Sequence, residues 1–167
     1  LFLFFAQAEI FQCYVVGVTD GDTITCLNDQ KERVKVRLYQ IDALELDQPY
    51  GEEAKHALSD MVLKKNVLVY TEFPPQDKTI LGTVYLLERG DFCSLNLRKC
   101  NSLIYDVNYF AILSGFAWYF PVHKTDKAYN DANSVNYSVA EIMAKESKRG
   151  LWADKHAMPP WEYRKQK

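Results

Sequence analysis

The sequence predicts an α+β fold, mainly β, built as a five-stranded Greek-key barrel with three α-helices. Five short stretches rich in β-branched and aromatic residues are bounded by turn signals, and an amphipathic helix separates the third stretch from the fourth. Five strands with a helix in that position are typical of the OB barrel. The chain has 167 residues, which suits one hydrophobic core, so we expect a single domain over residues 9–167.

The first three strands are predicted by their apolar patterns and by one turn. Residues 10–18 are β-branched and aromatic, and the Asp20-Gly21 pair that follows is a turn signal. Residues 23–27 form the return strand. Residues 31–41 alternate between apolar and charged side chains, which predicts a strand with one buried face.

The next elements are a helix and two further strands. Residues 51–65 repeat apolar side chains at steps of three and four, which predicts a helix. Residues 66–73 and 81–88 read as strands joined by a turn at Pro74–Lys78. Residues 90–105 have no clear period, so we expect an inserted loop there.

Two helices are predicted after that loop. Asp106 caps a short helix that ends near Gly115, and a last helix covers residues 132–149 before Gly150. The side chains of the last helix expected to face the core are Val135, Val139, Ile142 and Met143.

The charge of the chain is unevenly distributed. The net charge of −2 argues against a protein that coats nucleic acid with positive charge, and no apolar run is long enough to span a membrane. Residues 9–62 hold 11 acidic and 5 basic side chains, so we expect a localised anionic site in that half. The basic side chains of the C-terminus are expected to form a solvated tail: Lys148, Arg149, Arg164, Lys165 and Lys167.

The N-terminus predicts export. Residues 1–8 are an apolar run closed by an Ala-x-Ala pattern, which is typical of the end of a signal peptide cleaved after Ala8; the alternative is a buried first strand. We therefore expect a periplasmic or secreted protein, in a compartment where disulfides persist.

The four cysteines are expected to pair as Cys13–Cys26 and Cys93–Cys100, the alternative being four free thiols. A four-residue turn at 18–21 would place Cys13 directly opposite Cys26. A two-residue turn would leave them diagonal and too far apart for an unstrained bridge.

Four side chains near two strand ends predict the chemistry. Asp22 and Asp42 follow neighbouring strands, and two carboxylates with a backbone carbonyl hold a hard cation economically. Glu45 lies close enough in sequence to orient or deprotonate a water that attacks a phosphate. Arg37 lies close enough to bind that phosphate. Each residue alone has an ordinary structural explanation, but together they supply what phosphodiester hydrolysis requires.

With these residues identified, the sequence resembles the staphylococcal nuclease (thermonuclease) family. The resemblance covers nearly all of the chain after residue 9, in order and with similar spacing. The strings that carry it are Val18–Thr23, Val36–Leu38, Ile41–Glu45, Gln48–Ala54, Leu81–Tyr85, Asp106–Asn108, Gly115–Trp118, Lys148–Trp152 and Pro159–Arg164.

The resemblance implies a calcium-dependent nuclease that cleaves DNA and RNA, releases the 5′ oxygen and leaves 3′-phosphate ends. Asp22 and Asp42 match the family's calcium carboxylates, and Ala43 matches the residue that lends a backbone carbonyl. Glu45 matches the general base, and Arg37 matches the first of two arginines that clamp the phosphate. We expect a monomer with Tyr85 and Tyr119 as candidate substrate-binding aromatics.

Two departures from the family pattern predict reduced activity. Leu44 stands where the family has a proline, which loosens the turn that aims Glu45. The Tyr-Gly-Arg string that supplies the second arginine is missing, and Lys78 is the nearest candidate to replace it, as a point charge without a bidentate fork. The alternatives are a nuclease-like module that binds nucleic acid or protein without cleaving, and a plain protein-interaction domain.

Overall fold

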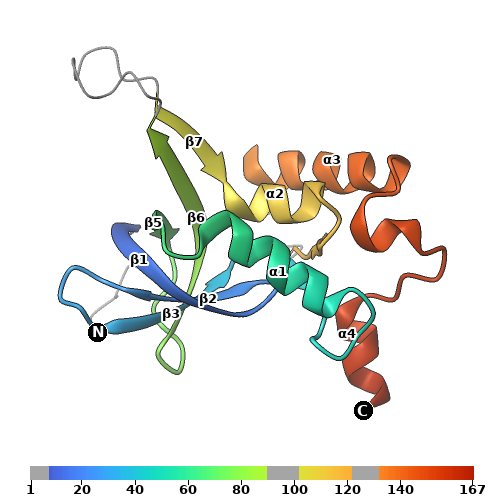
Figure 1. The fold of residues 1–167 in the computed structure, drawn as a ribbon, viewed down its shortest axis with the longest axis horizontal. Coiled ribbons are helices and arrows are strands. Elements are labelled where there is room, and N and C mark those ends of the chain that lie inside the picture. The colour runs from blue at the N-terminus through green and yellow to red at the C-terminus, as the bar shows by residue number, and fades with distance from the viewer. Residues whose placement is uncertain (1–7, 90–101, 122–131) are drawn as a thin grey trace, which may run out of the picture.

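The barrel has five strands, as the sequence predicts. The computed structural model describes residues 8–89, 102–121 and 132–167. The barrel strands are β1 (Glu9–Asp20), β2 (Thr23–Leu27), β3 (Arg33–Leu38), β5 (Asn66–Thr71) and β6 (Thr79–Arg89). They follow the order β3-β2-β1-β5-β6, and a parallel pairing of β3 with β6 closes the barrel. The OB prediction is confirmed, and Figure 1 shows the barrel on the side of the molecule away from the later helices.

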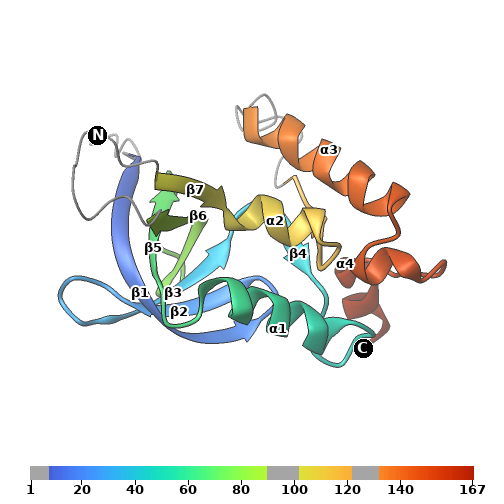
Figure 2. The ribbon, with the colours of Figure 1, turned by 45° about the horizontal axis from the view of Figure 1, so that its top comes forward.

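Three predicted helices are present, with a fourth that was not predicted. They are α1 (Gly51–Val62), α2 (Val107–Leu113), α3 (Ala132–Glu146) and the additional α4 (Pro160–Tyr163), with short 3-10 turns at Gly150–Ala153 and Arg164–Gln166. Asp106 caps α2 as expected, because its side chain accepts from the Tyr109 N–H. Helix α3 packs on α2, and both views show them side by side (Figures 1 and 2).

The prediction of which face of α3 is buried is wrong. The four apolar side chains expected to face the core are 42–62% exposed: Val135, Val139, Ile142 and Met143. The buried face instead carries Tyr137, Ala140 and Ala144. Small residues let α3 approach the rest of the molecule closely, and a hydrophobic pattern with two apolar stripes does not say which one packs.

Three short strands lie outside the predicted set. β7 (Ser102–Asp106) overlaps the end of the segment predicted as a loop, residues 90–105. It pairs with the end of β6, and the two strands extend out of the barrel (Figure 1). β4 (Ile41–Ala43) pairs with β8 (Ala117–Tyr119) in a separate two-stranded sheet. These pairings depend on partners distant in sequence, so local patterns do not predict them.

The Cys13–Cys26 disulfide is confirmed, but not by the predicted register. The hairpin has a two-residue turn, and Cys26 pairs with Val15 rather than with Cys13. The bridge still forms, with the two Cα atoms 5.6 Å apart. Two register shifts in β1 explain this, since such irregularities bend and twist a strand. Cys93 and Cys100 lie outside the described residues.

Aromatic side chains attach the C-terminal segment to the sheet that carries β4. The Trp118 ring lies 4.2 Å from the Trp152 ring and 5.6 Å from the Trp161 ring, and Phe120 also contacts Trp161. Helix α4 consequently lies beside β4 (Figure 2). Within the described ranges, no helix combines the length and apolar character that crossing a membrane requires.

Candidate active site

The turn between β1 and β2 places Asp22 against β4. The Asp22 N–H donates to Asp20 Oδ1 at 3.1 Å, and the Leu38 N–H donates to the Asp22 carbonyl at 2.8 Å. Gly21 packs so closely that a Cβ there would lie 2.7 Å from the Ala43 Cβ. A residue without a side chain therefore brings this turn up to the strand that carries Asp42.

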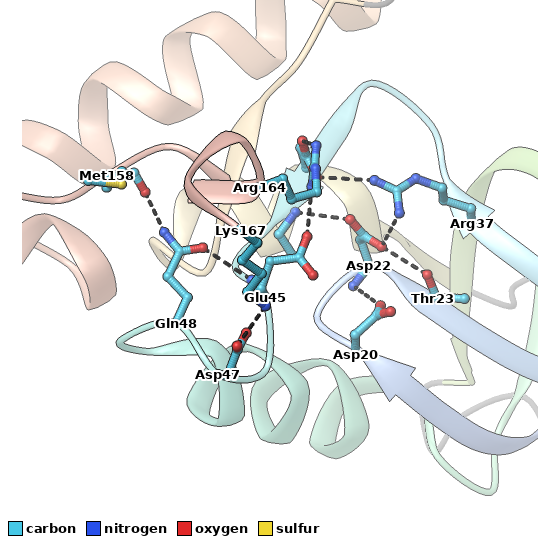
Figure 3. A network of polar contacts seen from close by, with 12 residues as sticks. Asp20, Asp22, Thr23, Arg37, Glu45, Asp47, Gln48, Met158, Arg164 and Lys167 are labelled. Carbon is cyan, nitrogen blue, oxygen red and sulfur yellow. Dashed lines mark hydrogen bonds and ion pairs between the residues drawn. The ribbon is translucent and has the colours of Figure 1, made fainter. Parts of the chain in front are cut away.

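One guanidinium joins the two predicted metal carboxylates. Arg37 donates to Asp22 Oδ1 at 3.0 Å and to Asp42 Oδ1 at 3.1 Å (Figure 3). Asp22 and Asp42 are only 3% and 2% exposed. The Ala43 N–H donates to Asp22 Oδ2 at 2.9 Å, and the Thr23 hydroxyl donates to Asp22 Oδ1. The structure thus brings Asp22, Asp42, Ala43 and Arg37 together.

A second guanidinium, from the C-terminus, reaches the same carboxylates. Arg164 contacts Asp42 through both nitrogens, at 3.2 Å to Oδ1 and 2.7 Å to Oδ2, and it donates to Glu45 Oε1 at 2.8 Å. These hydrogen bonds, that to Asp42 first, raise the pKa of Arg164 above its ordinary value. The expectation that Arg164 belongs to a solvated tail is wrong, because the turn that follows α4 carries it to the site.

The backbone at Glu45 is held in place without the family's proline. The Glu45 N–H donates to Gln48 Oε1 at 3.2 Å, and the Gln48 N–H donates to the Glu45 carbonyl at 2.9 Å. The Gln48 side chain also donates to the Met158 carbonyl at 2.6 Å (Figure 3). Gln48 therefore ties the Glu45 turn to the C-terminal segment, and Leu44 is buried beside them.

These residues border an acidic pocket of about 270 Å³. Its lining residues are Asp20, Asp22, Arg37, Asp42, Ala43, Leu44, Glu45, Leu46 and Asp47. Burial raises the pKa of Asp22 to about 7, and the Arg37 charge only partly offsets this. Five of the lining side chains are carboxylic acids and one, Arg37, is a cation, so the pocket is acidic.

The donor set fits a hard divalent cation. In the described part of the chain, no group of three or more His, Cys, Asp or Glu side chains is arranged to hold a metal ion. The carboxylate ligands at this site are therefore the pair Asp22 and Asp42. Two carboxylates, a carbonyl and waters are suitable oxygen ligands for such an ion. The destabilised Asp22 carboxylate supports the fit, because a nearby cation favours its charged form. Asp22, Asp42 and the Ala43 carbonyl are the groups that would hold it.

Lys78 is not brought to this pocket. Its neighbour Thr79 pairs with Lys35, whereas Arg37 pairs with Leu81. At about 3.3 Å per strand residue, the Lys78 backbone lies about 10 Å back along β3 from Arg37. Lys78 is exposed there and does not line the pocket.

Tyr85 and Tyr119 lie beside Tyr137 rather than in the pocket. Tyr119 pairs with Ile41, and its ring is 6.2 Å from the Tyr137 ring. Burial first, then the Asp106 charge, and then Tyr85 raise the pKa of Tyr137, which places Tyr85 close to it. Neither Tyr85 nor Tyr119 lines the pocket.

Sequence reasoning missed Arg164, although a signal was present. Arg164 ends the string Pro159–Arg164, one of the strings that carry the family resemblance. The chain separation of 122 residues between Asp42 and Arg164 gives no local pattern from which their contact follows.

The fold and site define an OB-barrel protein whose buried carboxylate pair and guanidinium groups meet in one pocket. Comparison with known sequences places it within a family: residues 35–154 match the model of the staphylococcal nuclease homologues, and the chain belongs to that family. Arg37, Asp42 and Glu45 lie within the match, whereas Arg164 lies beyond its end.

Similar proteins cover most of the chain. It is 31% identical to an uncharacterized endonuclease of Haemophilus influenzae, over 92% of this chain and 73% of that protein. It is 34% identical to protein ParB of Escherichia coli, over 91% of this chain and 78% of that one. A micrococcal nuclease of Shigella flexneri is 29% identical, over 93% of this chain and 81% of its own length.

Proposed function

We propose that this protein is a calcium-dependent endonuclease that hydrolyses phosphodiester bonds in DNA and RNA and leaves 3′-phosphate ends. The single observation that carries the proposal is the buried pair Asp22 and Asp42, joined by Arg37 in an acidic pocket beside Glu45. Membership of the staphylococcal nuclease homologues, with relatives named endonuclease and micrococcal nuclease, supports the same reaction class.

The proposed roles follow from charge. An acidic pocket repels a phosphate, so the substrate requires positive charge at the carboxylates. A calcium ion bound there would supply that charge and polarise the phosphate oxygens. Arg37, with 40% of its side chain exposed, keeps donors available for a phosphate oxygen while it remains anchored on Asp22 and Asp42.

Glu45 is the proposed base. Its side chain is one-third exposed, so a water can reach its carboxylate, unlike those of Asp22 and Asp42. Glu45 takes a proton from the water that attacks phosphorus, the bond from phosphorus to the 5′ oxygen breaks, and the departing oxygen takes a proton from solvent. Two hydrogen bonds between Gln48 and the Glu45 backbone hold this turn, and accurate positioning of a base is worth orders of magnitude in rate.

A digestion experiment tests the proposal. Single-stranded DNA is incubated with the protein in millimolar Ca²⁺ or in EDTA, with Glu45→Gln as the test variant and the exposed Glu53→Gln on α1 as its control. We expect calcium-dependent cleavage that Glu45→Gln slows by about 10²–10³-fold and Glu53→Gln leaves unchanged. Cleavage that is indifferent to calcium and to Glu45→Gln contradicts the proposal, and DNA binding without cleavage favours a non-cleaving module.

We also propose that the protein works in an oxidising compartment, the periplasm or the cell exterior. The buried Cys13–Cys26 disulfide supports this, because such bonds persist in those compartments and are rare in the cytosol.

A further inference from the structure

We propose that Arg164 alternates between two anionic partners: the Asp42 and Glu45 carboxylates in the cation-free protein, and a substrate phosphate once a divalent cation occupies Asp42. The inference rests on the proposed function and deepens it, because it assigns a second phosphate-binding arginine to a segment that the sequence did not connect with the site.

The cation and Arg164 compete for the same atoms. Arg164 uses both terminal nitrogens on the two oxygens of Asp42, at 3.2 and 2.7 Å. An ion on Asp42 needs at least one of those oxygens, and its positive charge also repels the guanidinium. Arg164 therefore stands in for a cation, and a bound cation displaces its fork.

The backbone that carries Arg164 stays beside the pocket when the fork moves. Trp161 packs against Trp118 and Phe120, and the Tyr163 hydroxyl donates to the Asp47 carbonyl at 3.0 Å. The Arg164 side chain itself is 44% exposed. An anchored backbone with a partly exposed side chain lets the guanidinium change partner while the segment stays docked. Figure 3 shows Arg164 beside the Glu45 carboxylate.

A phosphate is the natural second partner. A guanidinium displaced from carboxylates keeps its planar donors, which match phosphate oxygens bidentately. The Lys78 backbone lies about 10 Å from Arg37 along β3, and its side chain offers only a point charge. Arg37 and Arg164 both contact Asp42, so both can reach a phosphate held by a cation at that carboxylate.

Two binding measurements test the proposal. Calorimetry gives the Ca²⁺ affinity without nucleic acid, and fluorescence anisotropy gives the affinity for a labelled, cleavage-resistant phosphorothioate oligonucleotide in saturating Ca²⁺. The variants are Arg164→Ala, Arg164→Lys and the control Lys165→Ala. The Lys165 ammonium pairs with the neighbouring Glu162. Thermal unfolding and tryptophan emission report whether the segment remains docked.

The expected changes for Arg164→Ala have opposite signs. Calcium affinity rises about fivefold or more because a competing charge is removed, and oligonucleotide affinity falls about 10–100-fold because a fork is lost. Arg164→Lys keeps the charge and still loses oligonucleotide affinity, whereas Lys165→Ala changes either affinity less than about twofold. An unchanged oligonucleotide affinity, or a fall of both affinities in both Arg164 variants, overturns the proposal. If the wild-type protein binds neither calcium nor oligonucleotide, the proposed function fails and this inference fails with it.

Discussion

Gly51 lies against the carbonyl oxygen of Glu45. A Cβ at residue 51 would sit 1.9 Å from that oxygen and 3.0 Å from the Leu46 Cα. Its φ is not in the left-handed region, so the close approach and not the backbone conformation requires glycine here. The first residue of α1 thus forms one wall of the turn that presents the proposed base.

Gly51→Ala is expected to disturb catalysis more than folding. The added methyl pushes the Glu45 backbone away from α1, and a small displacement of a base costs rate heavily. We expect at least a tenfold loss in cleavage rate and about 1–3 kcal/mol of stability. Cleavage kinetics and urea unfolding measure both, with Glu53→Ala on the exposed side of α1 as the control. Normal activity in Gly51→Ala would show that Glu45 does not depend on this contact.

Cation affinity is expected to rise with pH between about 6 and 8. Burial raises the Asp22 pKa from 3.8 to about 7, so below that pH the carboxyl must lose a proton before it serves as a ligand. Calorimetric Ca²⁺ titrations should show the affinity approaching a tenfold change per pH unit below 7 and levelling off above. An affinity that is flat from pH 6 to 8 would contradict the protonation of Asp22 in the free protein.

The raised pKa of Asp22 also predicts how the stability of the cation-free protein depends on pH. The folded protein holds the Asp22 proton more tightly than the unfolded chain does, so this group favours folding below about pH 4 and loses that contribution as the pH rises through about 7. Asp22→Asn removes the dependence. The Tm of the variant minus the Tm of the wild type, both in EDTA, should therefore be several degrees larger at pH 8 than at pH 5. A difference in Tm that is independent of pH would refute it.

Removing the Cys13–Cys26 disulfide should cost stability without loss of cleavage. The bridged cysteines are 13 residues apart in the sequence, both are buried, and neither lines the pocket. The Cys13→Ala/Cys26→Ala protein is expected to lose about 2–4 kcal/mol in urea unfolding while its rate stays within about twofold. A large drop in rate in the still-folded protein would show that the hairpin conveys strain to Asp22.

Local patterns predicted the barrel because each strand carries its own signal. The Asp20-Gly21 turn, the alternation around Val36 and the helical period of 51–65 all lie within short windows, and the structure has the expected elements there. β7 and α4 were missed because their formation depends on distant partners: β7 adds to β6, and α4 is held by the ring contacts of Trp161.

The candidate site was predictable only where it is local in sequence. Asp22 lies in the turn between β1 and β2, Asp42 lies within the short strand β4 and Glu45 follows that strand, so the local order of strands and turns gathers them. Arg164 reaches them through the packing of Trp161 and the link from Gln48 to Met158, neither of which a spacing argument reveals. Lys78 was chosen because it replaces a missing string, and the parallel register of β3 and β6 places it elsewhere.

The carboxylate pair is the centre of this account, and its most direct test is cleavage by variants that lack one charge. Asp22→Asn and Asp42→Asn are compared with the exposed loop variant Asp29→Asn on a 5′-labelled single-stranded oligonucleotide in millimolar Ca²⁺, with circular dichroism confirming the fold. We expect rates lowered by about 10³-fold or more for both pocket variants, and a normal rate with 3′-phosphate products for Asp29→Asn. Wild-type cleavage by a folded Asp22→Asn or Asp42→Asn protein would contradict the assignment of this pocket as the active site.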